Sequence, residues 1–373
     1  MTRKAYPEYH KVLMDQASYP VAPRHIRYQE TRCSHLYKTG GEVFKLPKSG
    51  HVYSSLAVTE RLVREALASG RRWAPQVMIG MAQIVAAGDG LRLAAMPGLP
   101  DAAGALPLAP APPDAQPVAY ALRQRQFSES PWVDQLVRAG KLTDVSIGRI
   151  ARFLAQRHGE APVDERDAAA GRPEQIAALA DELLTQVRKH IGATLSEPMY
   201  QLMARPLQRT LPDLHKLLLR RVKKGRIVQC HGAFVPEHVY VKSLEVEAVS
   251  PVLTQTKYHC ADAVLDVACF VNGLLLLDAA PAAELFQARY AAAAKDRDLE
   301  ALLPIYQVLM ALRRGLGASE AAADATLPDE LREEMRHAAQ SHFSLGVHVA
   351  RSMGRPVPAP AAAVQNAESA GAL

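Results

Sequence analysis

Apolar side chains recur at two different spacings along this chain, and the spacing of two prevails in its first third. Apolar and polar residues alternate over residues 24–28 and 42–46, which predicts strands there. Gly40-Gly41 precedes the second segment and predicts a hairpin turn. Further segments of strand character cover residues 77–85, 91–93 and 118–122.

One predicted helix interrupts these strands. Apolar residues from Val58 to Leu67 recur at intervals of three and four, and Ser69-Gly70 is expected to end the helix. Residues 97–117 are rich in proline, alanine and glycine. A loop of this length is uncommon inside a compact domain, so we expect a surface excursion that is partly disordered.

Helical spacing prevails from about residue 130 onward. A strand-rich island over residues 226–253 interrupts it, and residues 356–373 have the proline- and alanine-rich composition of a disordered tail. The pattern predicts an α+β protein, with a sheet lobe over 1–123 and a larger, mainly helical lobe over 124–355. The predicted helices cover residues 130–158, 173–194, 197–222, 262–276, 281–294, 298–315 and 328–350.

Composition and charge narrow the function classes. The chain has 22% charged residues and a net charge of +6, which favours anionic partners such as nucleotides only weakly. No basic run with interleaved aromatics is present, so no nucleic-acid partner is predicted. The densest basic cluster, Arg220 to Arg226, is predicted to be a solvated helix end that Gly225 caps.

The cysteines and apolar runs point to a reduced, cytoplasmic protein. The four cysteines form no CxxC pair, which makes structural zinc and a disulfide framework poor expectations. The N-terminal residues lack an apolar segment, and no apolar run reaches the roughly 18 residues of a membrane span. The best candidate, residues 264–279, contains Asp266 and Asn272 and reads as a buried helix.

The strand-rich island carries the segment of most chemical interest. Residues 226–241 place His231-Gly232 after one predicted strand and before another. This segment resembles the catalytic loop of the aminoglycoside phosphotransferase-like kinases, where His-Gly-Asp follows a strand and a metal-binding asparagine follows soon after. The resemblance implies a two-lobed, protein-kinase-like fold.

Other segments extend the resemblance over roughly residues 10–315. They are closest to a branch of bacterial proteins in which this kinase-like domain is often fused to a P-loop ATP-binding domain. No GxxxxGK[ST] motif occurs in this chain, so the fused domain is absent from it. The matching segments, in the same order as in that branch, are residues 13–20, 30–31, 34–36, 43–46, 65–67, 71–75, 119–123 and 262–268.

The resemblance assigns a role to each residue of the loop. Ala233 occupies the position of the catalytic aspartate, and alanine can neither accept a proton nor orient a hydroxyl. His231 is expected to hydrogen-bond the loop backbone, and Gly232 to allow the backbone conformation that the loop needs. Glu237 is the nearest carboxylate, and His238 takes the asparagine-like position.

Two residues of the sheet lobe match the family's nucleotide site. Lys45 corresponds to the strand lysine that contacts the nucleotide phosphates, and Glu65 to the helix acid that pairs with it. The plainer alternatives are a solvent-facing strand lysine and an exposed helical glutamate.

The predicted metal ligands are incomplete. In the strand after the loop, Glu247 keeps a carboxylate, whereas Ser250 replaces the second acid of the family. Because Mg²⁺ prefers hard oxygen ligands, His238 is a poor substitute for asparagine. Glu247 could equally be an exposed strand residue. Asp262 and Asp266 are predicted to lie on one helix face and to support the loop.

These positions leave three functional hypotheses. The first is a pseudokinase that has lost phosphoryl transfer, binds ATP at Lys45 and Glu65, and acts on a protein partner. The second is an active, atypical ATP-dependent phosphotransferase in which Glu237 or Glu247 replaces the missing acid. The third is a scaffold without any nucleotide function. ATP is the expected ligand in the first two, and Mg²⁺ is the weaker expectation.

Overall fold

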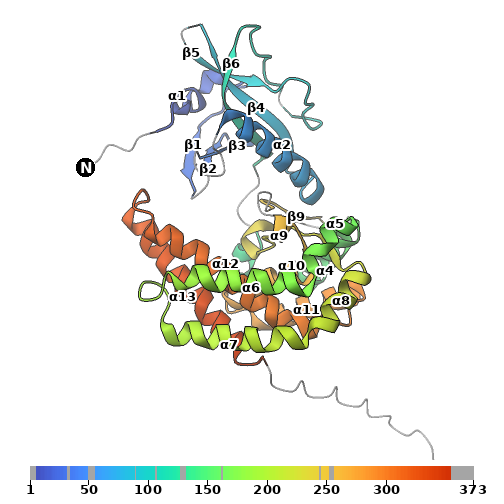
Figure 1. The fold of residues 1–373 in the computed structure, drawn as a ribbon. Helices are drawn as coiled ribbons and strands as arrows, with labels where there is room; N and C mark the ends of the chain where they lie inside the picture. The colour runs from blue at the N-terminus through green and yellow to red at the C-terminus, as the bar shows by residue number, and fades with distance from the viewer. Residues whose placement is uncertain are drawn as a thin grey trace, which may run out of the picture.

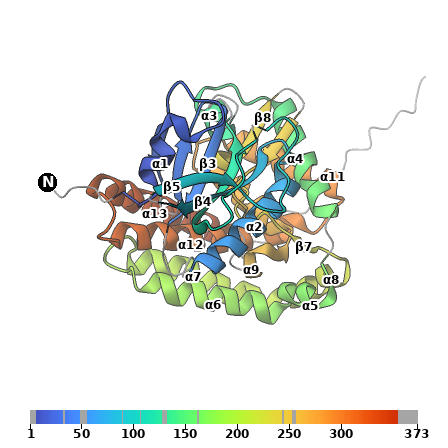
Figure 2. The ribbon, with the colours of Figure 1, turned by 90° about the horizontal axis from the view of Figure 1, so that it is seen from above.

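The computed structural model describes residues 6–31, 34–48, 55–88, 90–105, 107–126, 132–160, 163–242, 245–251 and 256–353. Two lobes follow one another along the chain, a sheet lobe and a larger helical lobe, as predicted (Figure 1). Figure 2, which looks down on the sheet lobe, shows that helix α6 runs along one edge of the helical lobe. The predicted tail at 356–373 and Cys33 lie outside the described residues.

The sheet lobe is built on a six-stranded antiparallel sheet. Its strand order is β1-β2-β3-β6-β4-β5, so β6 enters between β3 and β4. The lobe also holds a short helix α1 (His10–Met14), the 3-10 turn η1 (Gln16–Ser18) and the long helix α2 (Leu56–Trp73). The strands are β1 (Arg27–Glu30), β2 (Ser34–Lys38), β3 (Glu42–Pro47), β4 (Met78–Ala87), β5 (Gly90–Ala95) and β6 (Gln116–Arg125).

Alternation in β3 confirms the strand predicted over residues 42–46. Phe44 and Leu46 point into the core and are almost fully buried, whereas Lys45 lies on the opposite, half-buried face. The predicted hairpin turn is also present, because Gly40 has a φ of 91°, which favours glycine. The first predicted strand begins later than expected, at Arg27.

Helix α2 does not end at Ser69-Gly70 as predicted. It continues to Trp73, and Gly70 lies inside it against β4. A Cβ atom on Gly70 would come within 2.8 Å of the Met78 side chain. The glycine therefore marks a close approach between helix and strand and not a helix end.

The described residues of the long loop over 97–117 pack against the sheet lobe at several points, and the expected partial disorder stays a prediction. Asp101 accepts a hydrogen bond from Arg123, which is fully buried in β6. Leu108 belongs to the core beneath the sheet, and the backbone of Ala109 bonds that of Ala95. These contacts fix the loop to the face of the sheet.

The helical lobe packs around the nearly all-buried helix α10, which confirms the buried helix predicted there. Helix α12 pairs with α13 and α10, and α11 packs on α4. No described helix is long and apolar enough to cross a bilayer. The helices are α3 (Val133–Arg138), α4 (Asp144–Gly159), α5 (Glu165–Ala168), α6 (Pro173–Arg188), α7 (Glu197–Asp213), α8 (His215–Lys223), α9 (Thr256–His259), α10 (Val264–Leu275), α11 (Ala280–Ala294), α12 (Leu299–Ala323) and α13 (Asp329–Ala350).

The predicted island divides into two small antiparallel pairs. Strand β7 pairs with β10, and β8 pairs with β9. Helix predictions that spanned such breaks were too long: 130–158 is two helices, 197–222 is two helices, and 262–276 starts with the end of β10. The short elements are β7 (Ile227–Gln229), β8 (Val239–Lys242), β9 (Glu245–Ala248), β10 (Cys260–Asp262) and the 3-10 turns η2 (Ala169–Gly171) and η3 (Pro236–His238).

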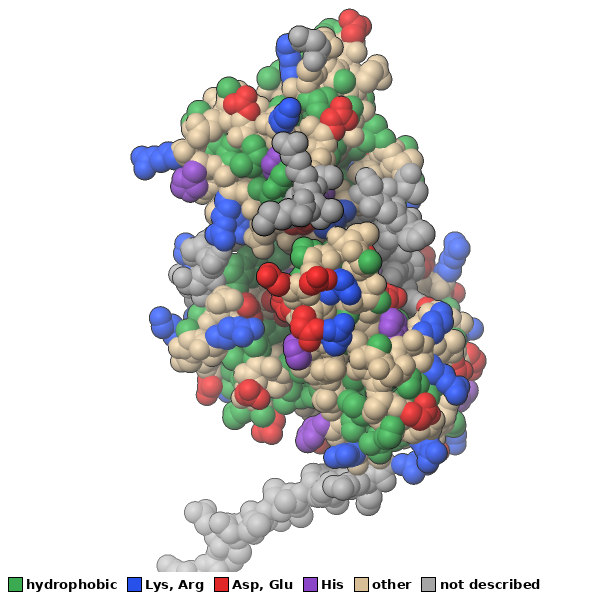
Figure 3. Space-filling model, turned by 90° about the vertical axis from the view of Figure 1, so that its left-hand side faces the viewer, with side chains coloured by type: hydrophobic (Ala, Val, Ile, Leu, Met, Phe, Trp, Pro, Cys, Tyr) green, Lys and Arg blue, Asp and Glu red, His purple; other side chains and the backbone are tan. Residues whose placement is uncertain are grey.

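The basic cluster at 220–226 is only partly a solvated helix end. Helix α8 ends at Lys223, and Gly225 has a φ of 64°, as a glycine after a helix often does. Arg221, however, is fully buried and forms ion pairs with Asp262 and Asp296. Figure 3 shows one face of the molecule, on which basic and acidic side chains are interspersed.

Candidate functional site: a degenerate catalytic loop beneath a basic cleft

Backbone contacts hold the loop after β7 in one conformation. The buried Asp266 carboxylate of α10 accepts hydrogen bonds from the backbone N–H of His231 at 2.6 Å and of Gly232 at 2.8 Å. His158 of α4 also bonds Asp266, at 3.1 Å. Gly232 has a φ of 74°, which confirms that the loop needs a glycine there. The predicted support of the loop by Asp266 is therefore confirmed.

Two further side chains bind carbonyl groups of the same loop. Arg313 donates to the Gly232 oxygen at 2.5 Å and lies over the Tyr258 ring. His238 bonds the Ala233 oxygen through Nδ1 at 3.0 Å. The loop backbone is thus held from both sides, independently of any ligand.

Asp262 supports the loop less directly than predicted. It is the last residue of β10 and not part of the helix, so it does not share a helix face with Asp266. Its carboxylate pairs with Arg221 and accepts from the backbone N–H of Val264. It therefore fixes the start of α10, from which Asp266 reaches the loop.

His231 has a structural position but not the predicted hydrogen bonds. Its ring is fully buried, and an edge contact joins it to Trp73. Neither ring nitrogen has a hydrogen-bond partner of good geometry among the described residues. Burial lowers the pKa of His231 to about 3, so the ring is neutral. The backbone, and not the ring, anchors this residue.

Ala233, which the resemblance matches to the catalytic aspartate, brings no functional group to the loop. Ala233 is half-buried at the centre of the loop, between the anchored Gly232 and the fully buried Phe234. The loop backbone is thus held in place, and its central residue presents a methyl group.

Glu237 is held away from Ala233 by an arginine of α12. Its carboxylate pairs with Arg314 at 2.7 Å, and 43% of the side chain is exposed. Partial burial raises the pKa of Glu237, but Arg314 and His238 lower it further, so the pKa lies below its ordinary value. Glu237 is therefore ionised and paired at neutral pH.

Glu247 joins the two lobes. It is buried in β9, and its carboxylate oxygens accept from the backbone N–H groups of Gln76 and Val77 at 3.2 and 3.3 Å. Burial raises its pKa to about 7. Because both oxygens face the turn between α2 and β4, this geometry does not favour the predicted metal role, which stays a prediction. The alternative of an exposed strand residue is wrong.

Ser250 occupies the point where the strand lysine meets the helical lobe. Lys45 Nζ donates to Ser250 Oγ at 3.2 Å. Ser250 has a φ of 61°, a conformation that serine rarely adopts. Ser250, which the resemblance matches to the family's second acid, thus lies in contact with Lys45.

The structure does not bring Lys45 and Glu65 together. Glu65 pairs with Arg61 on the exposed side of α2, at 3.1 Å. The α2 residues that share a small cavity of about 130 Å³ with Lys45 are all apolar, namely Leu62, Val63 and Ala66. The nucleotide role of Lys45 stays a prediction. The role of Glu65 also stays a prediction, although the ion pair with Lys45 from which it was inferred is not present.

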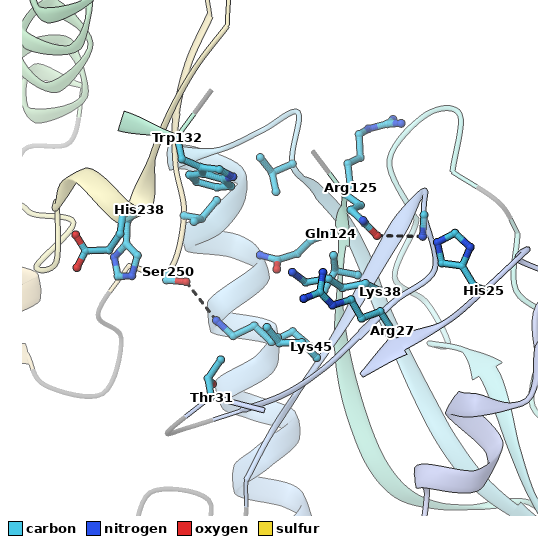
Figure 4. Close-up of a pocket in the computed structure, with 17 residues that line it drawn as sticks. His25, Arg27, Thr31, Lys38, Lys45, Gln124, Arg125, Trp132, His238 and Ser250 are labelled. Carbon is cyan, nitrogen blue, oxygen red and sulfur yellow. Dashed lines mark hydrogen bonds between the residues drawn. The ribbon is translucent and has the colours of Figure 1, made fainter. Parts of the chain in front are cut away.

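A cleft of about 560 Å³ lies between the sheet and the degenerate loop. Strands β1, β2, β3 and β6 form one wall, and η3 and the segment after β9 form the other (Figure 4). Figure 4 shows Arg27 and Lys38 side by side on the sheet and Lys45 reaching toward Ser250. The charged and histidine side chains that line the cleft are His25, Arg27, Lys38, Lys45, Arg125, Glu237 and His238.

A second hollow of about 510 Å³ opens on the other side of Glu237. It lies between α3, α10, α12 and α13, and charges of both signs line it. Its residues include Asp134, Arg138, Glu334 and His342. Glu237 thus lines both hollows.

The donor set fits Mg²⁺ poorly. Of the positions that the resemblance assigns to metal, His238 and Ser250 supply no carboxylate, and the carboxylate of Glu247 is occupied by the backbone N–H groups of Gln76 and Val77. A buried group of three, His158, Cys230 and Asp266, has ligand atoms within 4.8 Å of one another. The Asp266 oxygens already accept from the loop backbone, so this group is the loop's anchor.

Sequence reasoning missed the two other cations of the cleft, Arg27 and Lys38. A signal was present: both lie in strands whose alternate residues, Tyr28 and Tyr37, point into the core. Strand pairing, which places them opposite each other, could not be inferred from local spacing. Ser250 was noticed as a lost acid, but its contact with Lys45 depends on how the lobes meet.

Comparison with known proteins gives a match in fold. No family model matches the sequence, and a search of curated proteins finds no match. A choline/ethanolamine kinase family protein from Mesorhizobium loti has a TM-score of 0.50 and 12% identity, with 92% of this chain and 99% of that chain covered. A choline kinase from Cryptosporidium parvum Iowa II has a TM-score of 0.51 and 10% identity, with 92% and 95% covered.

The GDP complex of aminoglycoside 2′-phosphotransferase-IIIa has a TM-score of 0.48 and 14% identity, with 91% of this chain and 99% of that chain covered. Membership of the branch with a fused P-loop domain stays a prediction. The chain has the two-lobed, kinase-like fold of these choline and choline/ethanolamine kinase structures, in agreement with the fold that the sequence resemblance predicted.

Proposed function

We propose that this protein binds a nucleotide in the cleft between its lobes and does not transfer the phosphoryl group. In this proposal, nucleotide binding regulates the interaction of the protein with a protein partner. The observation that carries the proposal is Ala233 at the centre of a fully anchored catalytic-type loop. The loop backbone is anchored, whereas the position matched to the reactive group carries a methyl group.

The proposed loss of transfer follows from what phosphoryl transfer needs. A kinase places the phosphates, neutralises their charge and orients the attacking hydroxyl, and removing a general base typically costs about 10²–10⁴-fold in rate. The described carboxylates nearest the loop are engaged elsewhere: Glu237 with Arg314, Glu247 with backbone N–H groups, and Asp266 with the loop itself. None of them stands at the position of Ala233.

The proposed retention of nucleotide binding rests on the cleft. Its volume of about 560 Å³ suits a nucleotide-sized ligand, and its cations favour an anionic one. Lys45 lies at the centre of the cleft, as a phosphate-contacting lysine must. Lys45 and the other cations of the cleft belong to the wall that the sheet lobe forms.

A thermal-shift screen with ATP, GTP and adenosine, followed by an ATP-turnover assay, tests the proposal. We expect nucleoside triphosphates to raise the melting temperature, Lys45→Ala to abolish that shift, and turnover to stay at the buffer rate. Turnover that Lys45→Ala eliminates would contradict the loss of transfer. No shift with any nucleotide would favour a scaffold without nucleotide function.

An active, atypical phosphotransferase is the second candidate, and Glu237 favours it. This ionised carboxylate lies between the two hollows, where it could orient an acceptor hydroxyl if Arg314 released it. That mechanism predicts turnover which Glu237→Gln abolishes. Glu247→Gln serves as the comparison, because its carboxylate faces the turn after α2.

A further inference from the structure

We propose that the cleft recognises a polyphosphate group without a divalent metal, because Arg27, Lys38 and Lys45 neutralise the charge that Mg²⁺ neutralises in an intact kinase. This inference rests on the proposed nucleotide site and specifies how that site binds phosphates. It concerns the phosphate end of the ligand, which a nucleotide shares with inorganic polyphosphate.

Strand register brings the three cations onto one surface. Arg27 of β1 lies directly opposite Lys38 of β2, and paired residues of antiparallel strands point to the same face. Lys45 of β3 lies opposite Leu36, two residues from Lys38 on the same strand face. All three side chains line the cleft.

The pair of Arg27 and Lys38 is unfavourable without an anion. Like charges directly opposite each other on neighbouring strands repel. No carboxylate of the described residues forms an ion pair with either side chain. Two opposed cations at the wall of a cleft, without an acidic partner among the described residues, indicate a site for negative charge.

Other charged groups of the cleft do not cancel this potential. Glu237, the one acid among the described lining residues, is paired with Arg314. Arg125 points away from the other cations, and its Nη2 donates to the Ala103 oxygen (Figure 4). The net charge that faces the ligand is therefore positive, and Arg27, Lys38 and Lys45 supply it.

The loss of metal ligands and the gain of cations are complementary. Mg²⁺ prefers carboxylate and other oxygen ligands, and the positions matched to metal ligands offer no free carboxylate: His238 and Ser250 have none, and that of Glu247 binds backbone N–H groups. A triphosphate without magnesium is more negative than its magnesium complex, so it gains more from a cationic wall. The same substitutions that remove the metal thus favour the metal-free ligand.

Titration calorimetry with ATP and with tripolyphosphate, each in EDTA and in excess Mg²⁺, tests this inference on the full chain. We expect both ligands to bind in EDTA and Mg²⁺ to weaken the binding. Arg27→Gln and Lys38→Gln should each weaken it up to about fivefold, as loss of one exposed charge pair does. Arg92→Gln, an exposed cation of β5 away from the cleft, should leave binding unchanged.

The outcomes separate this inference from the proposed function. Binding of ATP only in the presence of Mg²⁺ would overturn metal-free recognition and leave the nucleotide site standing. Binding of tripolyphosphate but not ATP in EDTA would support the cationic site and overturn the nucleotide part. If neither ligand binds under either condition, both proposals are overturned.

Stability of the ligand-free protein gives an independent readout. Because Arg27 and Lys38 repel each other, Lys38→Gln should melt at or above the wild-type temperature in the absence of ligand while it binds ligand more weakly. A lower melting temperature for this variant would show that Lys38 stabilises the folded protein. It would contradict the inference that Lys38 is kept in the cleft for an anionic ligand.

Discussion

Residues of one type do different work in this protein according to their surroundings. Arg221 is buried between two aspartates, whereas its neighbour Arg220 is half-exposed and pairs at the surface. Glu247 and Glu245 alternate along β9, yet only Glu247 is buried. In the sequence these residues appear only as members of a basic run or of an alternating strand. Their burial in the folded protein determines which of them form internal ion pairs or hydrogen bonds.

Glu247 gives a pH prediction at this scale. Its pKa rises from 4.5 unfolded to about 7 folded, so the folded protein binds the proton more tightly. Stability that is present at pH 5 is therefore lost as the pH rises toward 8, by about 1–3 kcal/mol. Urea denaturation of the wild type and of Glu247→Gln measures this at both pH values.

We expect the unfolding free energy of the wild type, relative to that of the variant, to be lower at pH 8 than at pH 5. Glu245→Gln is the matched control, because Glu245 is exposed on the same strand. An equal difference at the two pH values would show that burial does not control the Glu247 carboxyl.

At the scale of elements, glycines mark where segments approach closely. Gly273 of α10 lies against Pro236, the first residue after the degenerate loop, and a Cβ atom would come within 2.2 Å of the proline ring. The helix that carries Asp266 therefore also fixes the far end of the loop. Side-chain volume at one helix position thus determines where η3 lies.

Gly273→Ala should destabilise the protein by about 1–3 kcal/mol through overpacking, although alanine favours a helix by about 1 kcal/mol over glycine. Gly148→Ala in α4 is the control, because a Cβ there meets its nearest neighbour at an ordinary 3.6 Å. Urea denaturation compares the two. A Gly273→Ala variant as stable as Gly148→Ala would contradict the tight packing of α10 on η3.

Elements with strong local patterns could be predicted from the sequence, and pairings could not. Strand β3 and helix α10 follow directly from their apolar spacing. The predicted end of α2 was too early because Gly70 serves the close packing of the helix on Met78 and does not end the helix. The loop that contains Asp101 looked unstructured in the sequence, yet Arg123 binds it. Of the site, the loop and Lys45 were found by resemblance, whereas the partner of Lys45 and the opposed Arg27 and Lys38 depend on register and lobe contact.

At the scale of the whole molecule, helix α2 links the two lobes. Its last residue, Trp73, is part of the helical lobe's core, although the helix belongs to the sheet lobe. Arg72 donates to the backbone oxygens of Gln229 and Arg157, and Glu247 binds the turn after α2 from the other side. The cleft is therefore closed at its back by fixed contacts.

Arg72→Met should loosen this link. We expect about 1–3 kcal/mol of lost stability from the hydrogen bonds of a charged donor, and faster amide hydrogen exchange in α2 than in α12. Arg71→Met is the neighbouring control, because Arg71 bonds Pro100 within the sheet lobe. Unchanged exchange in α2 would mean that Trp73 alone holds the lobes together.

The central claim, that the cleft binds a nucleotide and leaves it intact, is tested most directly by equilibrium dialysis against ATP labelled at the γ-phosphate, in EDTA to measure binding and in excess Mg²⁺ to permit transfer. The account predicts an excess of labelled ATP on the protein side in EDTA, which Lys45→Ala removes and Arg92→Gln does not, and intact ATP under both conditions. Label found as free phosphate or on an acceptor in proportion to protein, or no excess at all, would contradict it.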